Sequence, residues 1–380
     1  VAGSRAHKLG ALARGELEWR PLSPAAPDHM LVPRPVERPE YASFPSLSDL
    51  FEFHSVAGKP GDDAVLVSFA RDEVIPKLER ARATLGSETR PSEAMRKLAR
   101  RHAEEPFEPA RVQPYAYRPF DERFVYDEPE IWTRPVRELR ARIDGEPLLW
   151  VSRVVKDRDF AHVFVSRGLP DVIGLSPTSS VNCHVFPASA LRVELLAAGL
   201  PAVPSRADGF AYVYAILHSP GYRRRHRDAL RDDYPRIPLP RDAVLFERLA
   251  AHGARLLALH LLEAMPPSLP RFVDGGERAV RRVGEPGRRL AAVEAGRGRL
   301  YINDRSFFED VPLGVARHRV GGYLVAFKWL QDRRRARRDL DAQEVEHHRR
   351  VLGVLAATRA EMAAIERAIR ASGGWPHAFR

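Results

Sequence analysis

The sequence contains a single cysteine, Cys183, among its 380 residues. One cysteine excludes an internal disulfide framework and a zinc site built from several cysteines, and we expect Cys183 to be a small buried residue. No apolar run approaches the roughly 20 residues that a membrane-spanning helix needs, so no membrane partner is expected. The chain begins Val1-Ala2-Gly3-Ser4, without an initiator methionine or a signal peptide. We expect a piece of a longer, cytoplasmic protein.

The motifs of nucleotide-dependent and methyl-transferring enzymes are also missing. No glycine-rich dinucleotide fingerprint is present, and Gly58-Lys59-Pro60-Gly61 lacks the spacing of a phosphate-binding loop. An amino-group methyltransferase needs an Asn/Asp-Pro-Pro-Phe/Tyr turn to hold the flipped base; Asp127-Glu128-Pro129 has the wrong order. His347-His348 cannot both face one metal from a helix, and we expect both on an exposed face. The sequence therefore predicts no catalytic site, metal or cofactor in this chain.

Positive charge is in excess. Lysine and arginine total 61 against 50 acidic residues, a net charge of +11. This balance favours a polyanionic partner, because basic side chains release the counterions condensed on phosphates. Arginine is abundant and lysine scarce, however, and a GC-rich genome produces the same composition. Charge alone leaves both explanations open.

Hydrophobic periodicity divides the chain into four expected segments. Residues 1–45 lack periodic pattern and are interpreted as a linker or the tail of a preceding domain. Residues 46–110 are expected to form an α/β connector. In residues 111–240 short aromatic and β-branched runs alternate with turns, which predicts short strands. Residues 241–380 are expected to form a mainly helical support domain.

Particular elements follow from the same pattern. We predict a strand at 64–69, helices at 72–85 and 92–104, and helices at 243–264 and 342–371. The fold class expected is α+β, with a short-stranded mixed sheet recognition domain followed by a mostly helical C-terminal part.

Basic and aromatic residues alternate in one short segment, Tyr117-Arg118-Pro119-Phe120-Asp121-x-Arg123. In a strand Asp121 and Arg123 share a face, so the carboxylate could orient Arg123 toward a phosphate or a guanine edge. Arg118 and Arg123 are therefore candidate DNA contacts. The alternative is that Asp121 forms an internal ion pair with an arginine.

A second group lies in and after the segment between two predicted strands. Arg153, Lys156 and Arg158 suit a loop tip that enters a groove. Arg167 and the polar run that contains Thr178 and Asn182 follow, and such side chains read base edges. The alternative, which the sequence slightly favours, is that these residues form a solvated loop.

The densest basic run, Tyr222-Arg223-Arg224-Arg225-His226-Arg227, follows Ser219-Pro220 and is expected at a helix start. Tyr222, Arg223 and Arg227 are candidate phosphate contacts, with an exposed charged helix face as the alternative. The run 333–338 is similar but partly offset by nearby aspartates, which favours a solvated face.

Five segments together resemble a known family. They are Phe51-Glu52-Phe53-His54-Ser55-Val56, the Tyr117–Arg123 segment, Tyr212-x-Tyr214-Ala215-Ile216-Leu217-His218-Ser219-Pro220-x-Tyr222-Arg223, Asp233-Tyr234-Pro235-Arg236-Ile237-Pro238, and Gly321-Gly322-Tyr323-x-Val325-x-x-Lys328-Trp329-Leu330-x-Asp332-Arg333. Their order resembles the C-terminal specificity region of Type ISP restriction-modification enzymes. The third and fifth segments are the most specific.

The resemblance implies a role in bacterial defence against phage. In that family one polypeptide joins a nuclease, a translocase, an adenine-specific methyltransferase and this target-recognition region, and the parent uses S-adenosylmethionine, ATP and magnesium. The region reads an asymmetric double-stranded DNA site and presents the target adenine. The segments themselves are expected to be framework, with Gly321-Gly322 at a close backbone approach. Residues Gly58–Asp63 depart from the family's usual Gly-x-x-Thr-x-Arg-Asp pattern, which puts any contact there in doubt.

Two functions remain open at this point. The chain is either a DNA-recognition module or a scaffold that docks onto the methyltransferase and translocase domains with few DNA contacts. The arrangement of charge discriminates between them. Convergence of Arg118, Arg153, Lys156, Arg158 and Arg223 on one concave face favours recognition, and their dispersal favours the scaffold.

Overall fold

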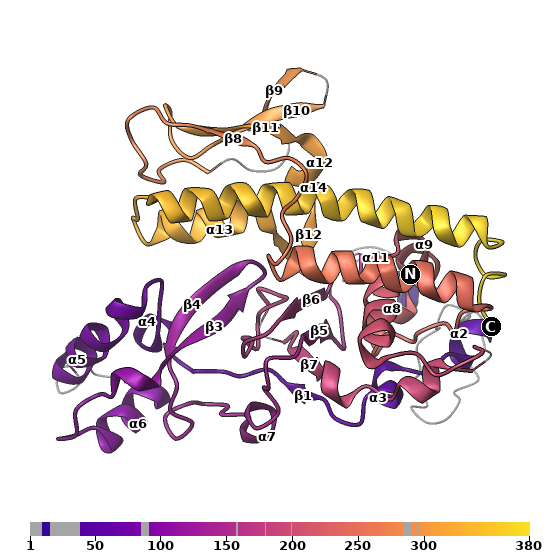
Figure 1. Cartoon of the computed structure of the whole chain (residues 1–380). Coiled ribbons are helices and arrows are strands. Elements are labelled where there is room, and N and C mark those ends of the chain that lie inside the picture. Colours follow the sequence, from indigo (N-terminus) through magenta and orange to yellow (C-terminus); the bar gives the residue numbers. More distant parts are fainter. Residues whose placement is uncertain are drawn as a thin grey trace. The chain divides into compact units, whose positions relative to one another are not determined.

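The structure is a computed structural model of the whole chain, shown in Figure 1. It describes residues 10–15, 39–84, 91–156, 159–178, 180–198, 200–283, 290–294 and 296–380. Contacts divide the chain into two units, 1–38 and 39–380, and everything below concerns the second. Arg158 and most of the expected N-terminal linker lie outside the described residues.

The N-terminal part of this unit is made of short elements. They are α2 (Pro39–Ser43), α3 (Leu47–Leu50), β1 (Ser55–Val56), α4 (Asp63–Leu66), β2 (Val67–Ser68), α5 (Val74–Thr84) and α6 (Glu93–Arg101). Both helices predicted for this region are confirmed, and Ser92 caps α6 by accepting from the backbone N–H of Met95. The strand predicted at 64–69 is wrong in its first half. Asp63 in the first turn favours a helix start there, and only Val67 and Ser68 pair with β4.

Two antiparallel sheets occupy the middle of the chain. One has the order β2-β4-β3, with β3 at Val112–Arg118 and β4 at Asp121–Tyr126. The other has the order β1-β7-β5-β6, with β5 at Leu148–Ser152, β6 at Val163–Ser166 and β7 at Cys183–Pro187. A short helix, α7 (Arg137–Arg140), lies between them in sequence. Cys183 is fully buried, as predicted.

Helices dominate the rest, together with a small third sheet and a two-stranded ribbon. The helices are α8 (Arg206–His218), α9 (Pro220–Arg225), α10 (Ala229–Asp232), α11 (Ala243–His260), α12 (Leu313–Ala316), α13 (Val325–Arg335) and α14 (Ala342–Ala371). The sheet has the order β8-β11-β10-β9 (Arg271–Val273, Phe307–Pro312, Arg297–Tyr301, Leu290–Glu294), and the ribbon pairs β12 (Arg319–Val320) with β13 (Tyr323–Leu324). The α+β class is confirmed.

Two hydrophobic cores support these elements. The first joins the β2-β4-β3 sheet, the third sheet, α13 and the first half of α14. The second joins one face of the β5 sheet with α8, α11 and the end of α14. Helix α14 therefore contributes to both cores and lies alongside α11 and α13 (Figure 1). The expected domain boundaries at 110 and 240 stay predictions.

Candidate nucleic-acid interface

The arginines of the Tyr117–Arg123 segment lie inside the protein. Arg123 donates to both Asp121, at 2.9 Å, and Asp332 of α13, at 3.1 Å. Arg333 closes the network with a 2.9 Å hydrogen bond to Asp121. Burial alone would raise the pKa of Asp121, but the guanidiniums of Arg123 and Arg333 outweigh it and hold this pKa below its usual value. The structure therefore contains the internal ion pair that the sequence analysis gave as the alternative to a DNA contact.

Arg118 has a similar setting. Its guanidinium lies over the Tyr117 ring and pairs with the buried carboxylate of Asp171 at 3.0 Å. Tyr115 donates to the same carboxylate at 2.7 Å. The three side chains tie β3 to the segment between β6 and β7, so Arg118 supports the sheet from within.

Two residues of the basic run after Pro220 also face inward. Tyr222 is fully buried and donates to the carbonyl of Arg236 at 2.6 Å. Arg223 donates to the carbonyl of Leu217, and burial lowers its pKa to about 10. Ser219 caps the predicted helix start, accepting from the N–H of Tyr222. Through these bonds Tyr222 links α9 to the segment after α10, and Arg223 links α9 to the end of α8.

Three other predicted residues gather around the loop between β5 and β6. Arg153 is exposed and pairs with Asp233 at 2.8 Å, while Arg227 reaches Asp159 of this loop at 3.2 Å. Lys156 is exposed and donates to Ser180 at 2.7 Å. That last bond joins the β5–β6 loop to the polar loop 176–182.

The polar loop carries Thr178, which is exposed, and Asn182, which is half-buried. Its Pro177 lines a cavity of about 470 Å³ that is also lined by Arg319, Lys328 and Arg335, and by Asp332, which pairs with Lys328. We call this cavity the basic groove. Arg335 is exposed and has no carboxylate within 4.0 Å in the part of the chain that the structure describes, and Arg319 donates to the carbonyl of Gly322.

The β12–β13 ribbon is held against the segment before the polar loop by one backbone bond and one bond from a side-chain hydroxyl. The N–H of Gly322 donates to the carbonyl of Leu175 at 2.8 Å, and Tyr323 donates to the carbonyl of Ile173 at 2.8 Å. Gly321 has φ +58°, and a Cβ there would lie 1.8 Å from the Leu175 oxygen. The close approach expected at Gly321-Gly322 is confirmed, and only glycine fits.

Arg167 lies apart from these loops. It pairs with Glu263, just after α11, at 2.6 Å and also donates to the carbonyl of Gly145. The predicted residues thus separate into a set engaged with the protein interior (Arg118, Arg123, Tyr222, Arg223), a set around two adjoining loops (Arg153, Lys156, Thr178, Asn182, Arg227), and Arg167. None of these placements tests contact with DNA, which stays a prediction.

Sequence reasoning missed the cations of the basic groove. Arg335 belongs to a run interpreted as a solvated face, and Lys328 belongs to a segment interpreted as framework. Arg319 lies in the short segment Arg317-His318-Arg319, which the sequence analysis did not single out. The alternation of Lys328, Gln331 and Arg335 along one face of α13 was the available signal, because residues three and four apart share a helix face.

The adjacent histidines of α14 correct another expectation. His348 is fully buried and stacks on Trp329 with ring centroids 4.9 Å apart, and His347 donates to the carbonyl of Phe120 at 2.7 Å. The predicted exposed face is wrong, because α13 and the β3–β4 turn cover it. No group of three or more His, Cys, Asp or Glu in the described ranges could hold a metal ion. Among these residues, likewise, every helix is too short or too polar to cross a membrane.

Comparison with solved structures shows the fold in longer proteins. A nuclease-deletion mutant of the Type ISP restriction-modification enzyme LlaGI, in complex with a DNA substrate mimic, matches with TM-score 0.68 and 17% identity over 96% of this chain and 32% of that chain. A DrdV–DNA complex matches with TM-score 0.70 and 19% identity over 95% and 42%. The ATP-dependent Type ISP enzyme LlaBIII bound to DNA matches with TM-score 0.66 and 16% identity over 87% and 24%.

The chain therefore spans less than half the length of each of these structures. A search of curated proteins finds no match. The model of the Type ISP C-terminal specificity domain matches residues 49–358, which cover all five segments noted in the sequence. This chain belongs to the family of Type ISP C-terminal specificity domains.

Proposed function

We propose that this domain recognises a specific double-stranded DNA sequence on behalf of a restriction-modification enzyme. Membership of the specificity-domain family supports the proposal, as do three neighbours of the same fold whose structures contain DNA or a DNA mimic. The observation that carries it for this chain is the basic groove, where Arg319, Lys328 and Arg335 face a polar loop.

The two sides of the basic groove suit different parts of DNA. Arg319 and Arg335 are exposed cations that can neutralise phosphates and so fix the position of the duplex. Thr178 and Asn182 belong to the polar loop whose Pro177 lines the groove, and hydroxyl and amide groups can discriminate base edges. Lys156 is held beside them by Ser180. In this arrangement one side positions the DNA and the other reads it.

In the longer polypeptide, this reading would present the target adenine to a methyltransferase domain that lies upstream with a translocase domain. That parent would use S-adenosylmethionine, ATP and magnesium and would act in the bacterial cytoplasm as a defence against phage. The chain's part in the reaction is then binding and orientation of DNA.

Fluorescence anisotropy with a labelled duplex pool of random sequence tests the proposal. We expect the logarithm of the binding constant to fall linearly with the logarithm of salt concentration. Arg319→Gln and Arg335→Gln should each lower that slope by about 1. Arg137→Gln is the matched control, because Arg137 is exposed but pairs with Glu130 away from the groove. A slope near zero for the wild-type domain would contradict the proposal.

One observation favours the scaffold as a second candidate. Of the five cations whose convergence would favour recognition, Arg118 and Arg223 are engaged inside the protein. If the domain mainly couples other domains, Arg335→Gln should leave DNA affinity of the full enzyme unchanged. It should instead weaken association between this domain and a separately expressed upstream fragment, measured by calorimetry.

A further inference from the structure

The polar loop is closed on itself. Its two ends are joined where the N–H of Cys183 donates to the carbonyl of Val172 at 2.7 Å, and inside it the N–H of Val181 donates to the carbonyl of Thr178 at 2.9 Å. Thr178 and Asn182, the candidate base contacts of this loop, lie between the two ends. Because the loop is closed, its direction is set by the residues just before it.

Ile173, in the segment before the polar loop, is held at both of its backbone polar groups. Its N–H donates to the carboxylate of Asp171 at 2.8 Å, and its carbonyl accepts a 2.8 Å hydrogen bond from the hydroxyl of Tyr323, 150 residues further along the chain. Asp171 is fixed in turn by Arg118 at 3.0 Å and by Tyr115 at 2.7 Å. The base of the polar loop is therefore tied both to β3 and to the β12–β13 ribbon.

Tyr323 lies on the same short ribbon as one of the groove cations. In the register of this ribbon Val320 pairs with Tyr323, and Arg319 pairs with Leu324. The Tyr323 ring is only 4% exposed, and Tyr323 lines the basic groove together with Arg319 and Ile173. One element thus carries both a candidate phosphate contact and an anchor of the polar loop.

The Tyr323 hydroxyl is a donor at neutral pH. Burial raises its pKa to about 12, and the nearby Arg118 offsets only part of this rise. The Arg118 guanidinium and the Lys328 amine lie 5.6 Å and 5.8 Å from the centroid of the Tyr323 ring. Cations at this distance from a ring face are attracted to it. The orientation of the ring is therefore fixed in the chain without DNA.

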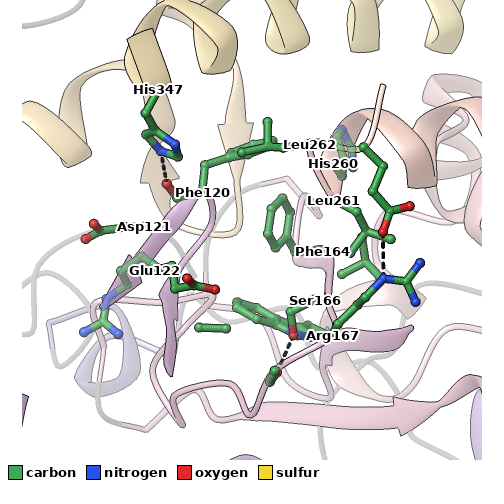
Figure 2. A pocket seen from close by; sticks show the side chains of 16 residues that line it. Phe120, Asp121, Glu122, Phe164, Ser166, Arg167, His260, Leu261, Leu262 and His347 are labelled. Atoms are coloured by element: carbon green, nitrogen blue, oxygen red, sulfur yellow. Dashed lines mark hydrogen bonds and ion pairs between the residues drawn. The ribbon is translucent and has the colours of Figure 1, made fainter. Parts of the chain in front are cut away.

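Space beside the base of the polar loop allows it to shift if the bond from Tyr323 is lost. Arg118 lines two cavities, the basic groove and a second one of about 280 Å³. Figure 2 shows the second cavity, whose walls include Phe120 and Phe164. A close-packed interior resists small displacements, but Arg118 borders open volume at two places. Asp171, which Arg118 holds, can then move with it by a fraction of an ångström.

Base recognition and phosphate attraction respond differently to such a shift. Hydrogen bonds to base edges weaken steeply when their distance or angle departs from the ideal geometry. The Coulomb attraction between a cation and a phosphate falls only slowly with distance. A displaced polar loop would therefore lose discrimination among sequences, while the cations of the basic groove would keep their contribution to binding.

We propose that Tyr323 is a positioning residue for sequence discrimination, whose hydroxyl sets the location of the polar loop relative to the cations of the basic groove. The proposal rests on the function proposed above and adds the residue that joins the two parts of that site. Tyr323 acts through the backbone of Ile173 and does not itself contact a base.

Tyr323→Phe in the 380-residue chain tests this role, because phenylalanine keeps the ring and removes only the hydroxyl. Selection from a random duplex library with the wild-type chain first supplies a preferred sequence. Fluorescence anisotropy then measures the ratio of the affinity for this sequence to the affinity for the random pool. The ratio should fall at least about threefold in Tyr323→Phe, the order expected for one lost hydrogen bond. The salt slope of binding to the random pool should stay unchanged, since no cation is removed.

Tyr212→Phe is the matched control. The Tyr212 hydroxyl donates to the carbonyl of Pro238 at 2.6 Å, in the second hydrophobic core and outside the basic groove. This variant loses a similar bond and should keep the wild-type affinity ratio. Without DNA, hydrogen exchange at the amide of Gly322, which donates to the segment before the polar loop, should be faster in Tyr323→Phe only. Thermal melting checks that both variants are folded.

The outcomes separate this role from the proposed function. An unchanged affinity ratio in Tyr323→Phe, beside salt-dependent binding by the wild-type chain, would overturn the role of Tyr323 and leave the proposed function standing. A wild-type salt slope near zero would overturn both. An equal fall of the ratio in Tyr212→Phe would overturn the role, because the loss of any buried hydroxyl would then have the same effect. Unfolding of Tyr323→Phe would overturn it as well, because the hydroxyl would then be needed for the fold itself.

Discussion

Arg333 donates a 2.9 Å hydrogen bond to Asp121, although 212 residues separate them in the chain. Their near neighbours in sequence, Arg123 and Asp332, also pair, at 3.1 Å. In this second pair the arginine belongs to β4 and the carboxylate to α13, the reverse of the first pair. Two of the family segments therefore meet in a reciprocal pair of buried ion pairs. This network joins β4 to α13, and its members have side chains only 2–10% exposed.

Replacing Asp121 should destabilise the domain strongly. Asp121→Asn removes the negative charge between two buried guanidiniums, and breaking one partner of a buried pair costs about 3–5 kcal/mol. Urea unfolding measures the change. The control is Glu138→Gln, whose ion pair with Arg142 is exposed, and where a change below about 1 kcal/mol is expected. Equal small effects at the two positions would show that the network does not stabilise the fold.

Gly321→Ala should open the basic groove. The added methyl group would lie 1.8 Å from the Leu175 oxygen, so the ribbon must separate from the opposite loop. Gly145→Ala introduces a similar positive-φ strain, at φ +90°, with no atom within 4 Å, and should cost only about 1–2 kcal/mol. Hydrogen exchange at the amide of Gly322 reports the separation. Unchanged protection there in Gly321→Ala would contradict the prediction.

A buried histidine cluster should make stability depend on pH. Burial lowers the pKa of His260 to about 3, with the positive charges of His318 and Arg223 adding to the effect. The ring is therefore neutral at pH 7. Because the Thr358 hydroxyl donates to the Val354 carbonyl, it accepts from Nε2 of His260, which leaves Nδ1 to accept from Tyr214.

Because the unfolded imidazole has a pKa near 6.5, the unfolded state gains a proton first as pH falls. The stabilisation is present above about pH 6.5 and is lost as pH falls toward 3, at about 1.4 kcal/mol per pH unit for each such histidine. Urea unfolding at pH 7 and pH 5 should show this loss. His260→Gln should reduce the pH slope, and an unchanged slope would count against the assignment.

The polar loop and the cations of the basic groove should contribute differently to DNA binding. Asn182→Ala should change the preference among sequences by about 1–3 kcal/mol per lost base contact. Arg335→Gln should weaken all sequences about equally. Selection from a random duplex library, read by sequencing the bound fraction, separates the two outcomes. An identical selected motif for wild type and Asn182→Ala would remove that residue from the reading surface.

Elements with strong periodicity were predictable from the sequence, and long-range partners were not. The helix expected at 342–371 is observed at Ala342–Ala371, because its apolar positions recur every three or four residues and Asp341 caps it. The roles of Arg118 and Arg123, as DNA contacts or as members of buried ion pairs, could not be assigned from the sequence. A basic residue beside aromatics suits either a DNA groove or a buried pair, and the deciding carboxylates, Asp171 and Asp332, lie far along the chain.

Helix α14 has a consequence for how the domain is assembled. Its 30 residues span about 45 Å, with Val351 and Leu355 in one core and Ile365 and Ile369 in the other. Both hydrophobic cores thus share one continuous helix. Neither core can be separated from the other without cutting α14. A break in the chain between Leu355 and Ile365 would leave two incomplete fragments that need each other to fold. The distance between the two cores is set by covalent geometry, which makes α14 a fixed spacer between the regions it joins.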